Sequence, residues 1–391
     1  MILGASYSQL PLYEAARQLG AATVAASTPG DWPGFDVADE SVYADITDPE
    51  AILAAAQEKG IDGIATCCLD AGVRALGYTC EKMGLIGPSA RAADISNDKF
   101  KMKEAFMAGG VQCARHICIH SLEELEEALE KLEFPVVLKA VDLMGSRGIF
   151  RCNTREETFF YYNKTMEATR KDYCLVEEFI EGQVLGCEAM IRDGRLLYCL
   201  PNNIEAFQSY VPTPIGHSVP YRKQEELGAE VRHQVEFAIK AVGLDNCPVN
   251  CDLIEKDGKI YVIEITGRAG GTCLPEMVSI YYGINYYEAI VRLALGMDVE
   301  EMFRGKTAGV ANLSRTLLSE KDGVVKAIHN ENEPAEDIVN LSFNITPGEE
   351  VHHYTNGRDR LGQVILRGES LESCEKRLQE ILSKINIEFT V

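Results

Sequence analysis

The chain has 391 residues, which is too long for one compact core, so two or three domains are expected. Its 46% hydrophobic and 25% charged residues are typical of a globular protein, and no apolar run approaches the roughly 20 residues that a membrane-spanning helix needs. The formal net charge of -22 argues against a nucleic-acid partner, because phosphate contacts need clustered Lys and Arg. A local basic pocket can still hold a small anion within an acidic protein.

The N-terminal residues and the thirteen cysteines bear on where the protein works. The start, MILGASYSQL, lacks the basic and apolar regions of a secretory signal. Its first residues resemble the end of a buried strand, so we expect a few residues to precede Met1 in the natural chain. Cys247 and Cys251 have no matching second pair, so zinc-ligand spacing is absent. The scattered cysteines predict reduced thiols in a cytoplasmic protein.

Residues 1–93 alternate between strand-like and helix-like segments. The expected strands are 1–6, 22–27, 62–68 and 85–87, and the expected helices are 10–20, 50–60 and 70–84. This alternation predicts a parallel sheet covered by helices. The first turn, residues 4–9, lacks the G-x-G-x-x-G fingerprint, which argues against an NAD(P)-linked oxidoreductase. We expect this domain to supply one wall of a substrate cleft.

Residues 94–300 predict a unit of two lobes. A helix capped at 96–98 runs to about Ala108, and the small lobe, about 111–175, contains a glycine loop. The large lobe, about 176–300, includes a turn at Asp257-Gly258, which is a strong type I′ hairpin signal. The expected helices are 122–132 and 225–242, and the expected strands are 135–140, 149–152, 173–180, 187–200 and 249–266.

The C-terminal residues 301–391 predict a third unit that mixes strands with one helix. The expected strands are 309–318, 322–329, 337–346, 362–368 and 385–391, with a turn at Asn356-Gly357 and a helix at 371–385. No internal repeat or low-complexity segment appears in the chain.

The hairpin at 249–266 contains the sharpest chemical signal. Asp252 lies on one strand and Glu264 on the other, and the tight turn places them side by side. Strands that are apolar on both faces are buried, so two acids within them need a partner. Magnesium prefers carboxylate and phosphate oxygens and would be such a partner. The alternative is a pair of edge acids that face solvent.

Cationic residues occur at positions that suit an anionic ligand. Arg268 follows the second acid, and Gly270 and Gly271 allow close approach of the backbone to a reacting group. Lys139 lies in an apolar strand, where its charge needs a counter-anion, and Lys99 follows a helix cap. Either lysine taken alone is more often solvated.

Two further segments suit a nucleotide. The glycine loop Gly145, Ser146, Arg147 and Gly148 offers backbone N–H groups to a phosphate chain, although it lacks the Walker A pattern. The stretch 177–180 precedes Gly182 like a hinge between lobes, and its main chain can contact an adenine edge.

In their order along the chain, these motifs resemble those of the ATP-grasp superfamily, and the resemblance covers nearly the whole sequence. They are N-D-K, P-V-V-L-K, G-S-R-G, E-E-F-I-E-G, the pair D-L-I and E-I-T-G-R, and the C-terminal V-K-A-I, T-P-G-E-E-V and R-L-G-Q-V-I-L-R-G. Each motif is weak alone, but their shared order is specific. The resemblance implies a parallel α/β pre-ATP-grasp domain at 1–93, a two-lobed ATP-grasp domain at 94–300 and a biotin-carboxylase-like lobe at 301–391.

The resemblance also implies roles for single residues. ATP would be held at its phosphates by Lys99 and Lys139 under the loop Gly145, Ser146, Arg147 and Gly148, and at its adenine by Glu177, Phe179 and Ile180. One or two Mg²⁺ ions would be bound by Asp252, Glu264 and Thr266. Arg268 would neutralise an acyl phosphate. His217, Gly270 and Gly271 would face the substrate, although a core or surface role is commoner for a lone histidine.

Two positions depart from the family pattern. Thr266 stands where an asparagine usually follows the bridging glutamate by two residues, and its shorter reach weakens the case for a second magnesium ion. Val184 stands where an acid usually binds the ribose hydroxyls, so ribose contacts must come from elsewhere.

The resemblance therefore implies an ADP-forming ligase that couples a carboxylate to an amine through an acyl phosphate. The layout is similar to L-amino-acid ligases and to the carbamoyl phosphate synthase large subunit. The alternatives are a bicarbonate-using carboxylase and a degenerate, non-catalytic nucleotide-binding protein. We expect a homodimer with small-molecule substrates and with neither nucleic acid nor membrane as a partner. The identity of the carboxylate and of the nucleophile stays open.

Overall fold

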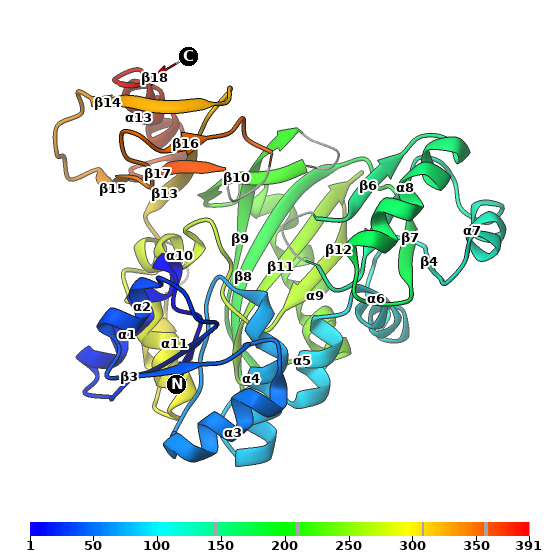
Figure 1. The fold of residues 1–391 in the computed structure, drawn as a ribbon, viewed down its shortest axis with the longest axis horizontal. Coiled ribbons are helices and arrows are strands. Elements are labelled where there is room, and N and C mark those ends of the chain that lie inside the picture. The colour runs from blue at the N-terminus through cyan, green and yellow to red at the C-terminus, as the bar shows by residue number, and fades with distance from the viewer. Residues whose placement is uncertain (144–146, 209–211, 307–308, 356–358, 391) are drawn as a thin grey trace.

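The computed structural model describes residues 1–143, 147–208, 212–306, 309–355 and 359–390 (Figure 1). An eight-stranded antiparallel sheet runs through the middle of the molecule, in the order β12-β11-β8-β9-β10-β13-β17-β15. Its strands are β8 Gln183–Arg192, β9 Arg195–Gln208, β10 Pro212–Val219, β11 Cys247–Lys256, β12 Lys259–Thr266, β13 Ala311–Leu318, β15 Ile338–Phe343 and β17 Arg360–Gly368. The smaller units are arranged around this sheet.

The N-terminal unit has the parallel sheet that the alternating pattern predicts. Its order is β1-β2-β3. Its elements are β1 Ile2–Leu3, α1 Leu10–Gln18, β2 Val24–Ser27, α2 Pro33–Val37, β3 Glu40–Tyr43, α3 Pro49–Lys59, α4 Val73–Met83 and α5 Ala90–Ser96. Leu12 and Tyr13 of α1 share a buried cluster with residues of α10 (Leu274–Tyr282) and α11 (Tyr286–Ala294), which in turn packs against the central sheet.

Two strands predicted in this unit are wrong. Residues 62–68 form no strand and make only the single bridges Ile2 with Ala65 and Cys67 with Ala269, and residues 85–87 form no strand either. Cys68 has a φ of 57°, a left-handed conformation that interrupts an extended run. Its N–H donates to Ala269 O at 3.0 Å. The segment therefore lies beside β1 at Ala65 and beside the loop after β12 at Cys67 and Cys68, without forming a strand of its own.

The small lobe is a four-stranded antiparallel sheet in the order β4-β7-β5-β6. Its elements are β4 His116–Ile119, α7 Leu122–Leu129, β5 Val136–Ala140, β6 Ile149–Cys152, α8 Arg155–Ala168 and β7 Cys174–Glu178. The sequence interpretation placed β7 at the start of the large lobe, but β7 pairs with β4 and β5. The reason is that it supplies the middle of this sheet, where its apolar residues are buried.

The hairpin of β11 and β12 forms with the predicted turn and register. Asp257 and Gly258 have φ values of 52° and 74°, as a type I′ turn requires. The register pairs Asp252 directly with Glu264. Helix α9, Gln224–Val242, packs against one face of this sheet through Val231, Val235 and other apolar residues. The two acids lie on the other face and point away from α9.

The C-terminal unit joins the central sheet through β13, β15 and β17 and adds a second sheet, β16-β14-β18. The other elements are α12 Glu300–Phe303, β14 Gly323–Asn330, β16 Glu350–Val351, α13 Leu371–Leu382 and β18 Ile385–Thr390. Helix α13 ends three residues before the predicted 385, since β18 begins there. The predicted turn at Asn356-Gly357 lies outside the described residues. In Figure 1 this unit and the small lobe lie on opposite sides of the central sheet.

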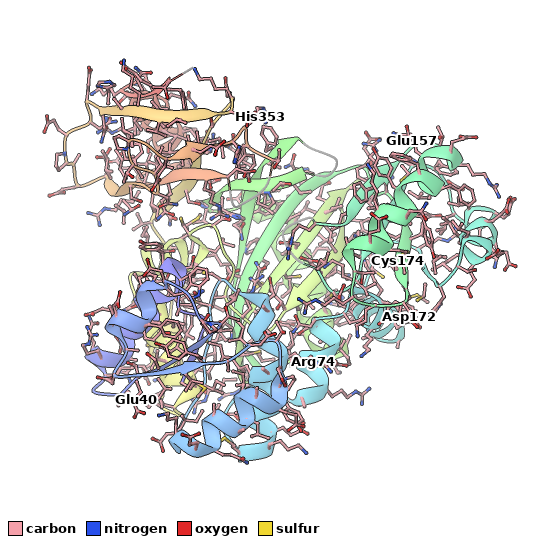
Figure 2. The ribbon with its side chains drawn as sticks, in the orientation of Figure 1. Glu40, Arg74, Glu157, Asp172, Cys174 and His353 are labelled. Atoms are coloured by element: carbon pink, nitrogen blue, oxygen red, sulfur yellow. The ribbon has the colours of Figure 1, made fainter. Side chains whose placement is uncertain are left out.

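Charged side chains cover the outside of the molecule. Glu40, Arg74 and Asp172 are exposed, whereas Cys174 is buried within the small lobe (Figure 2). In the described part of the chain, no helix combines the length and the apolar character needed to cross a membrane.

Candidate functional site

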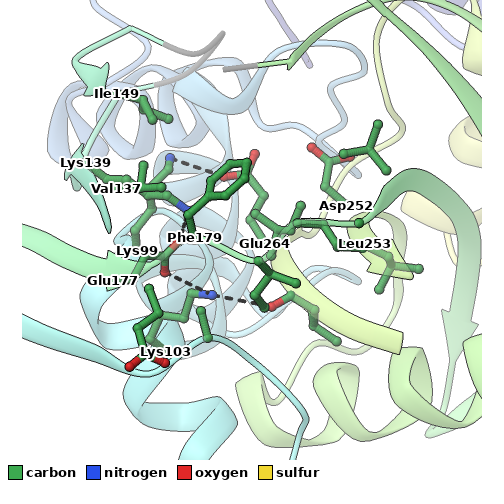
Figure 3. A pocket seen from close by; sticks show the side chains of 18 of the residues that line it. Lys99, Lys103, Val137, Lys139, Ile149, Glu177, Phe179, Asp252, Leu253 and Glu264 are labelled. Atoms are coloured by element: carbon green, nitrogen blue, oxygen red, sulfur yellow. Dashed lines mark hydrogen bonds and ion pairs between the residues drawn. The ribbon is translucent and has the colours of Figure 1, made fainter. Parts of the chain in front are cut away.

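A cleft lies between the small lobe and the central sheet (Figure 3). Residues of β5, β7 and α6 (Lys99–Ala108) line one side, and residues of β8, β11 and β12 line the other. The cleft brings together many of the residues singled out from the sequence, namely Lys99, Lys139, Glu177, Phe179, Ile180, Asp252 and Glu264. Val184, at the predicted ribose position, lines it as well.

Lys99 is positioned by the start of helix α6. Asp98 is the N-cap, and its carboxylate accepts hydrogen bonds from the N–H groups of Phe100 and Lys101. The Lys99 ammonium donates to Leu143 O at 2.8 Å and lies 3.3 Å from Glu264 Oε2. The helix start therefore brings a cation next to a carboxylate of the hairpin.

A buried group of three charges lies on the small-lobe side of the cleft. Lys139 forms an ion pair with Glu177 Oε1, and Lys103 Nζ lies 3.3 Å from Glu177 Oε2 (Figure 3). Burial alone would raise the pKa of Glu177, but the two lysines outweigh it and lower that pKa to about 2. Burial lowers the pKa of Lys139. Both oxygens of this carboxylate are thus held by cations.

The sequence interpretation missed Lys103. Its ammonium is 3.4 Å from Val262 O, and the whole residue is 2% exposed. The available signal was its spacing, because Lys103 follows Lys99 by four residues and so lies on the same helix face. Glu177 was expected to act through its main chain, and the structure adds this ionic role for its side chain.

Asp252 and Glu264 form an acidic pair on the sheet side of the cleft. Burial, and after it the neighbouring Glu264, raise the pKa of Asp252 to about 7, whereas Lys99 lowers the pKa of Glu264. Thr266 lies two residues beyond Glu264 on the same strand face, and its buried hydroxyl has no partner among the described residues. These oxygen atoms could bind a cation, and the oxygens of a ligand would then complete its coordination.

The donors fit magnesium, which commonly takes one or two carboxylates plus substrate phosphates rather than a cage made of protein alone. Among the described residues, no group of three or more His, Cys, Asp or Glu gathers around one point. The two carboxylates and the Thr266 hydroxyl therefore match a magnesium site that substrate phosphates complete.

Arg268 lies where the N-terminal unit meets the central sheet. Its Nε and Nη2 are both 2.5 Å from Asp70 Oδ1, and its Nη1 donates to Asn250 Oδ1 at 3.2 Å and to Ala269 O at 3.1 Å. Burial would lower the pKa of Arg268, but the Asp70 carboxylate raises it above its usual value. The guanidinium is therefore held as a fixed positive charge.

Glu188 lies beneath Arg268 and was also missed by the sequence interpretation. It is fully buried and accepts hydrogen bonds from Asn250 Nδ2 at 2.8 Å and from Gly270 N at 3.1 Å. Burial raises its pKa to about 8. A Cβ at Gly270 would lie 2.6 Å from Glu188 Oε1, so any other residue there would push the Glu188 side chain out of its place. At Gly271 the space is open.

The remaining predicted residues lie away from the cleft or outside the described residues. His217 is buried, and its Nδ1 lies 2.9 Å from Asn202 Oδ1. Burial, with a contribution from Arg360, lowers the pKa of His217 to about 3, so it is neutral near pH 7. Arg147 is exposed and Gly148 has a φ of 65°, while Gly145 and Ser146 fall outside the described residues.

Residues 96–272 match the family model of the ATP-grasp domain, and residues 315–390 match that of L-amino acid ligase C-terminal domain 2. A solved phosphoribosylglycinamide synthetase from Anaerococcus prevotii is 40% identical, with a TM-score of 0.85, over 100% of this chain and 98% of that one. The chain belongs to the ATP-grasp family. The resemblance that the sequence motifs carry is thereby confirmed.

This ATP-grasp chain also shares its fold with the L-amino acid ligase from Bacillus licheniformis, which is 20% identical with a TM-score of 0.86 over 100% of this chain and 98% of that one. The curated alanine–anticapsin ligase of Bacillus subtilis is 25% identical over 276 residues, which cover 64% of this chain and 58% of the relative. The chain spans less than two thirds of the length of the curated relatives it matches.

Proposed function

We propose that this protein is a ligase that uses ATP to join a carboxylate to an amine through an acyl phosphate, releasing ADP and phosphate. The observation that carries the proposal is the cleft in which Asp252 and Glu264 lie close to Lys99, with Lys139 on the other side. The relatives named phosphoribosylglycinamide synthetase and alanine–anticapsin ligase support it.

ATP would lie between the two lobes. Lys99 and Lys139 supply positive charge for its phosphates, and Phe179 and Ile180 offer an apolar surface for its base. The loop Gly145, Ser146, Arg147 and Gly148 is proposed to cover the phosphate chain. Enclosing the phosphates in this way excludes water and strengthens each charge contact.

Magnesium would be held by Asp252 and Glu264, with the Thr266 hydroxyl as a further oxygen. When bound, it supplies positive charge against the phosphate oxygens. The hairpin contributes rigidity, because its turn fixes the register that keeps the two carboxylates opposite one another.

In the first chemical step, an oxygen of the substrate carboxylate attacks the γ-phosphorus, and the bond from that phosphorus to the β–γ bridging oxygen breaks. In the second step, the amine attacks the acyl carbon and phosphate departs with its oxygen from the carboxylate. The amine proton passes to phosphate or to solvent. Arg268, held by Asp70, would neutralise the acyl phosphate, and Gly270 and Gly271 would allow the substrate to approach the backbone.

The substrates are proposed to be small molecules, with an amino acid as the carboxylate. An amino acid fits the relative whose product, phosphoribosylglycinamide, is an amide of glycine. It also fits the match to L-amino acid ligase C-terminal domain 2. The bicarbonate-using carboxylase is less favoured, since the carboxylase structures are no more than 19% identical and share only the fold.

We further propose a cytoplasmic homodimer divided into units at 1–93, 94–300 and 301–391. The thirteen cysteines support a reducing compartment, because all of them are free thiols in the structure. Even Cys187 and Cys199, whose sulfurs lie 3.3 Å apart, share a hydrogen bond and not a disulfide.

The proposal is tested by release of phosphate and ADP from Mg-ATP across amino acids, singly and in pairs, with glycine plus phosphoribosylamine and with bicarbonate as separate reactions. Release that needs one carboxylate and one amine, and that is lost in Glu264→Gln, supports the ligase. Stimulation by bicarbonate alone contradicts it and favours the carboxylase. No release in any reaction, together with no ATP binding by calorimetry, would favour the degenerate, non-catalytic protein.

A further inference from the structure

A second cavity, of about 360 Å³, lies on the other face of the central sheet. It is bounded by strands β9, β10 and β13, by the segment just before helix α9 and by helix α13. We call it the back-face cavity, and the residues that define it here are Arg222, Lys223, Tyr221, Arg315, Glu205 and Glu375.

The strand register places this cavity opposite the candidate site. Arg315 pairs with Gly216, while their neighbours Ser314 and His217 pair with each other. Because successive residues point to opposite faces, Arg315 points away from the face of His217. Leu313 shares the orientation of Arg315 and packs in one cluster with Leu378 of α13. The two faces are therefore separated by the sheet itself.

The charges around the back-face cavity are three cations and two carboxylates. Arg315 forms an ion pair with Glu205, and Arg222 forms one with Glu375. Lys223 lies 2.7 Å from Glu255 Oε2, a carboxylate outside the lining residues. Both acids in the lining have side chains about half exposed, so their ion pairs lie at the solvent edge.

The deeper wall contains hydrogen-bond donors that no described residue satisfies. Arg315 Nε is buried without a partner, and so is the hydroxyl of Tyr221, a residue only 4% exposed. A guanidinium N–H can only donate, and a phenol hydroxyl donates readily, so the unmet need is for an acceptor. A buried donor left without an acceptor is unfavourable. An acceptor oxygen that a ligand brought to either group would satisfy it.

Gly216 keeps the floor of the cavity open. A Cβ at this position would lie 2.5 Å from Ser314 O and 3.2 Å from Arg315 Nε, so no side chain fits. The absence of a side chain leaves room for the Arg315 side chain to lie over this strand.

From these observations we propose that the back-face cavity binds a small anion through a carboxylate or phosphate group, which Arg315 and Tyr221 contact from within. Arg222 and Lys223 attract it at the mouth. A planar guanidinium suits either anion, because its N–H groups match the spacing of two oxygens. On binding, the anion takes the place of Glu205 at Arg315, and the half-exposed Glu205 turns to solvent.

The test measures the thermal unfolding midpoint during titration with inorganic phosphate and, separately, with malonate, at ionic strength held constant with sodium chloride. Four variants are compared with the natural chain. Arg315→Met removes the buried donor and Tyr221→Phe removes one hydroxyl. Arg367→Met alters an exposed arginine of neighbouring β17, and Lys139→Met alters the candidate active site. No ATP or amine is present, so the result does not depend on the proposed ligase activity.

We expect at least one of the two anions to raise the midpoint of the natural chain, of Arg367→Met and of Lys139→Met. Half-saturation should need at least tenfold more anion in Arg315→Met and several-fold more in Tyr221→Phe. If Arg315→Met does not fold, the shift in Tyr221→Phe tests the proposal. A response lost in Lys139→Met but kept in Tyr221→Phe would overturn the proposal by placing the anion in the other cleft. The absence of any response in the natural chain would overturn it as well.

Discussion

Lys103 Nζ lies 3.3 Å from Glu177 Oε2, and both residues are less than 5% exposed. Lys139 holds the other oxygen of the same carboxylate. A carboxylate buried between two ammonium groups ties helix α6 to strands β5 and β7. Because Lys139 is also a proposed phosphate ligand, this network links the stability of the small lobe to its function.

Replacing Lys103 by Met should destabilise the protein by about 3 kcal/mol, the lower end of the range for breaking a buried ion pair, because Lys139 remains beside Glu177. Urea unfolding measures the change. The matched control is Lys101→Met, a partly exposed lysine of the same helix paired with Asp94, for which we expect about 0.5 kcal/mol or less. Equal losses in the two variants would contradict the account.

Glu188 should make stability fall as the pH rises through neutrality. Its folded-state pKa of about 8 lies above the value of about 4.3 for an unfolded glutamate, so between these values the folded state binds more protons. The free energy of unfolding then decreases by up to about 1.4 kcal/mol per pH unit. Urea unfolding of the natural chain and of Glu188→Gln at pH 5.5, 6.5 and 7.5 should give the shallower slope for the variant. Identical slopes would contradict the assignment.

Asp70 is predicted to position Arg268 for catalysis. Asp70→Asn keeps the shape of the side chain but removes the counter-charge 2.5 Å from the guanidinium. We expect kcat to fall by about one to two orders of magnitude, with a smaller change in KM, because the lost interaction acts mainly in the transition state. Steady-state kinetics measure both. The control is Asp36→Asn, an exposed acid of the same unit. A rise in KM alone would indicate a role in substrate binding instead.

Thr266 is predicted to matter for metal rather than for stability. Its hydroxyl makes no hydrogen bond among the described residues, so Thr266→Val should change the unfolding free energy by less than about 0.5 kcal/mol. The magnesium concentration for half-maximal activity should rise several-fold. Thr165→Val is the matched control, since the Thr165 hydroxyl is also buried without a partner but lies in α8. An unchanged magnesium requirement would remove Thr266 from the proposed donor set.

The hairpin of β11 and β12 could be predicted from the sequence because its turn chemistry is local. Asp257 and Gly258 both tolerate positive φ, which fixes the turn and hence the pairing of Asp252 with Glu264. Lys99 was likewise found through its helix cap. Such features depend on a few neighbouring residues.

Features that depend on distant residues were missed. Residues 62–68 have a strand-like composition, but the hydrogen bond from Cys68 to Ala269 ties the end of this segment to the loop after β12. Glu188 resembles any other acid in its sequence, and only tertiary packing buries it beneath Gly270. Strand β7 was assigned to the other lobe because its pairing with β4 and β5 is not encoded by its own pattern.

The most direct test of the acyl-phosphate mechanism is to follow oxygen from the carboxylate. The substrate carboxylate identified by phosphate release is labelled with ¹⁸O, and the phosphate formed from Mg-ATP in the presence of the amine is analysed by mass spectrometry. Turnover by the proposed route transfers one ¹⁸O to each phosphate, and Glu264→Gln should release almost none. Phosphate that forms at the full rate without ¹⁸O would contradict the central claim, because water rather than the carboxylate would then have attacked ATP.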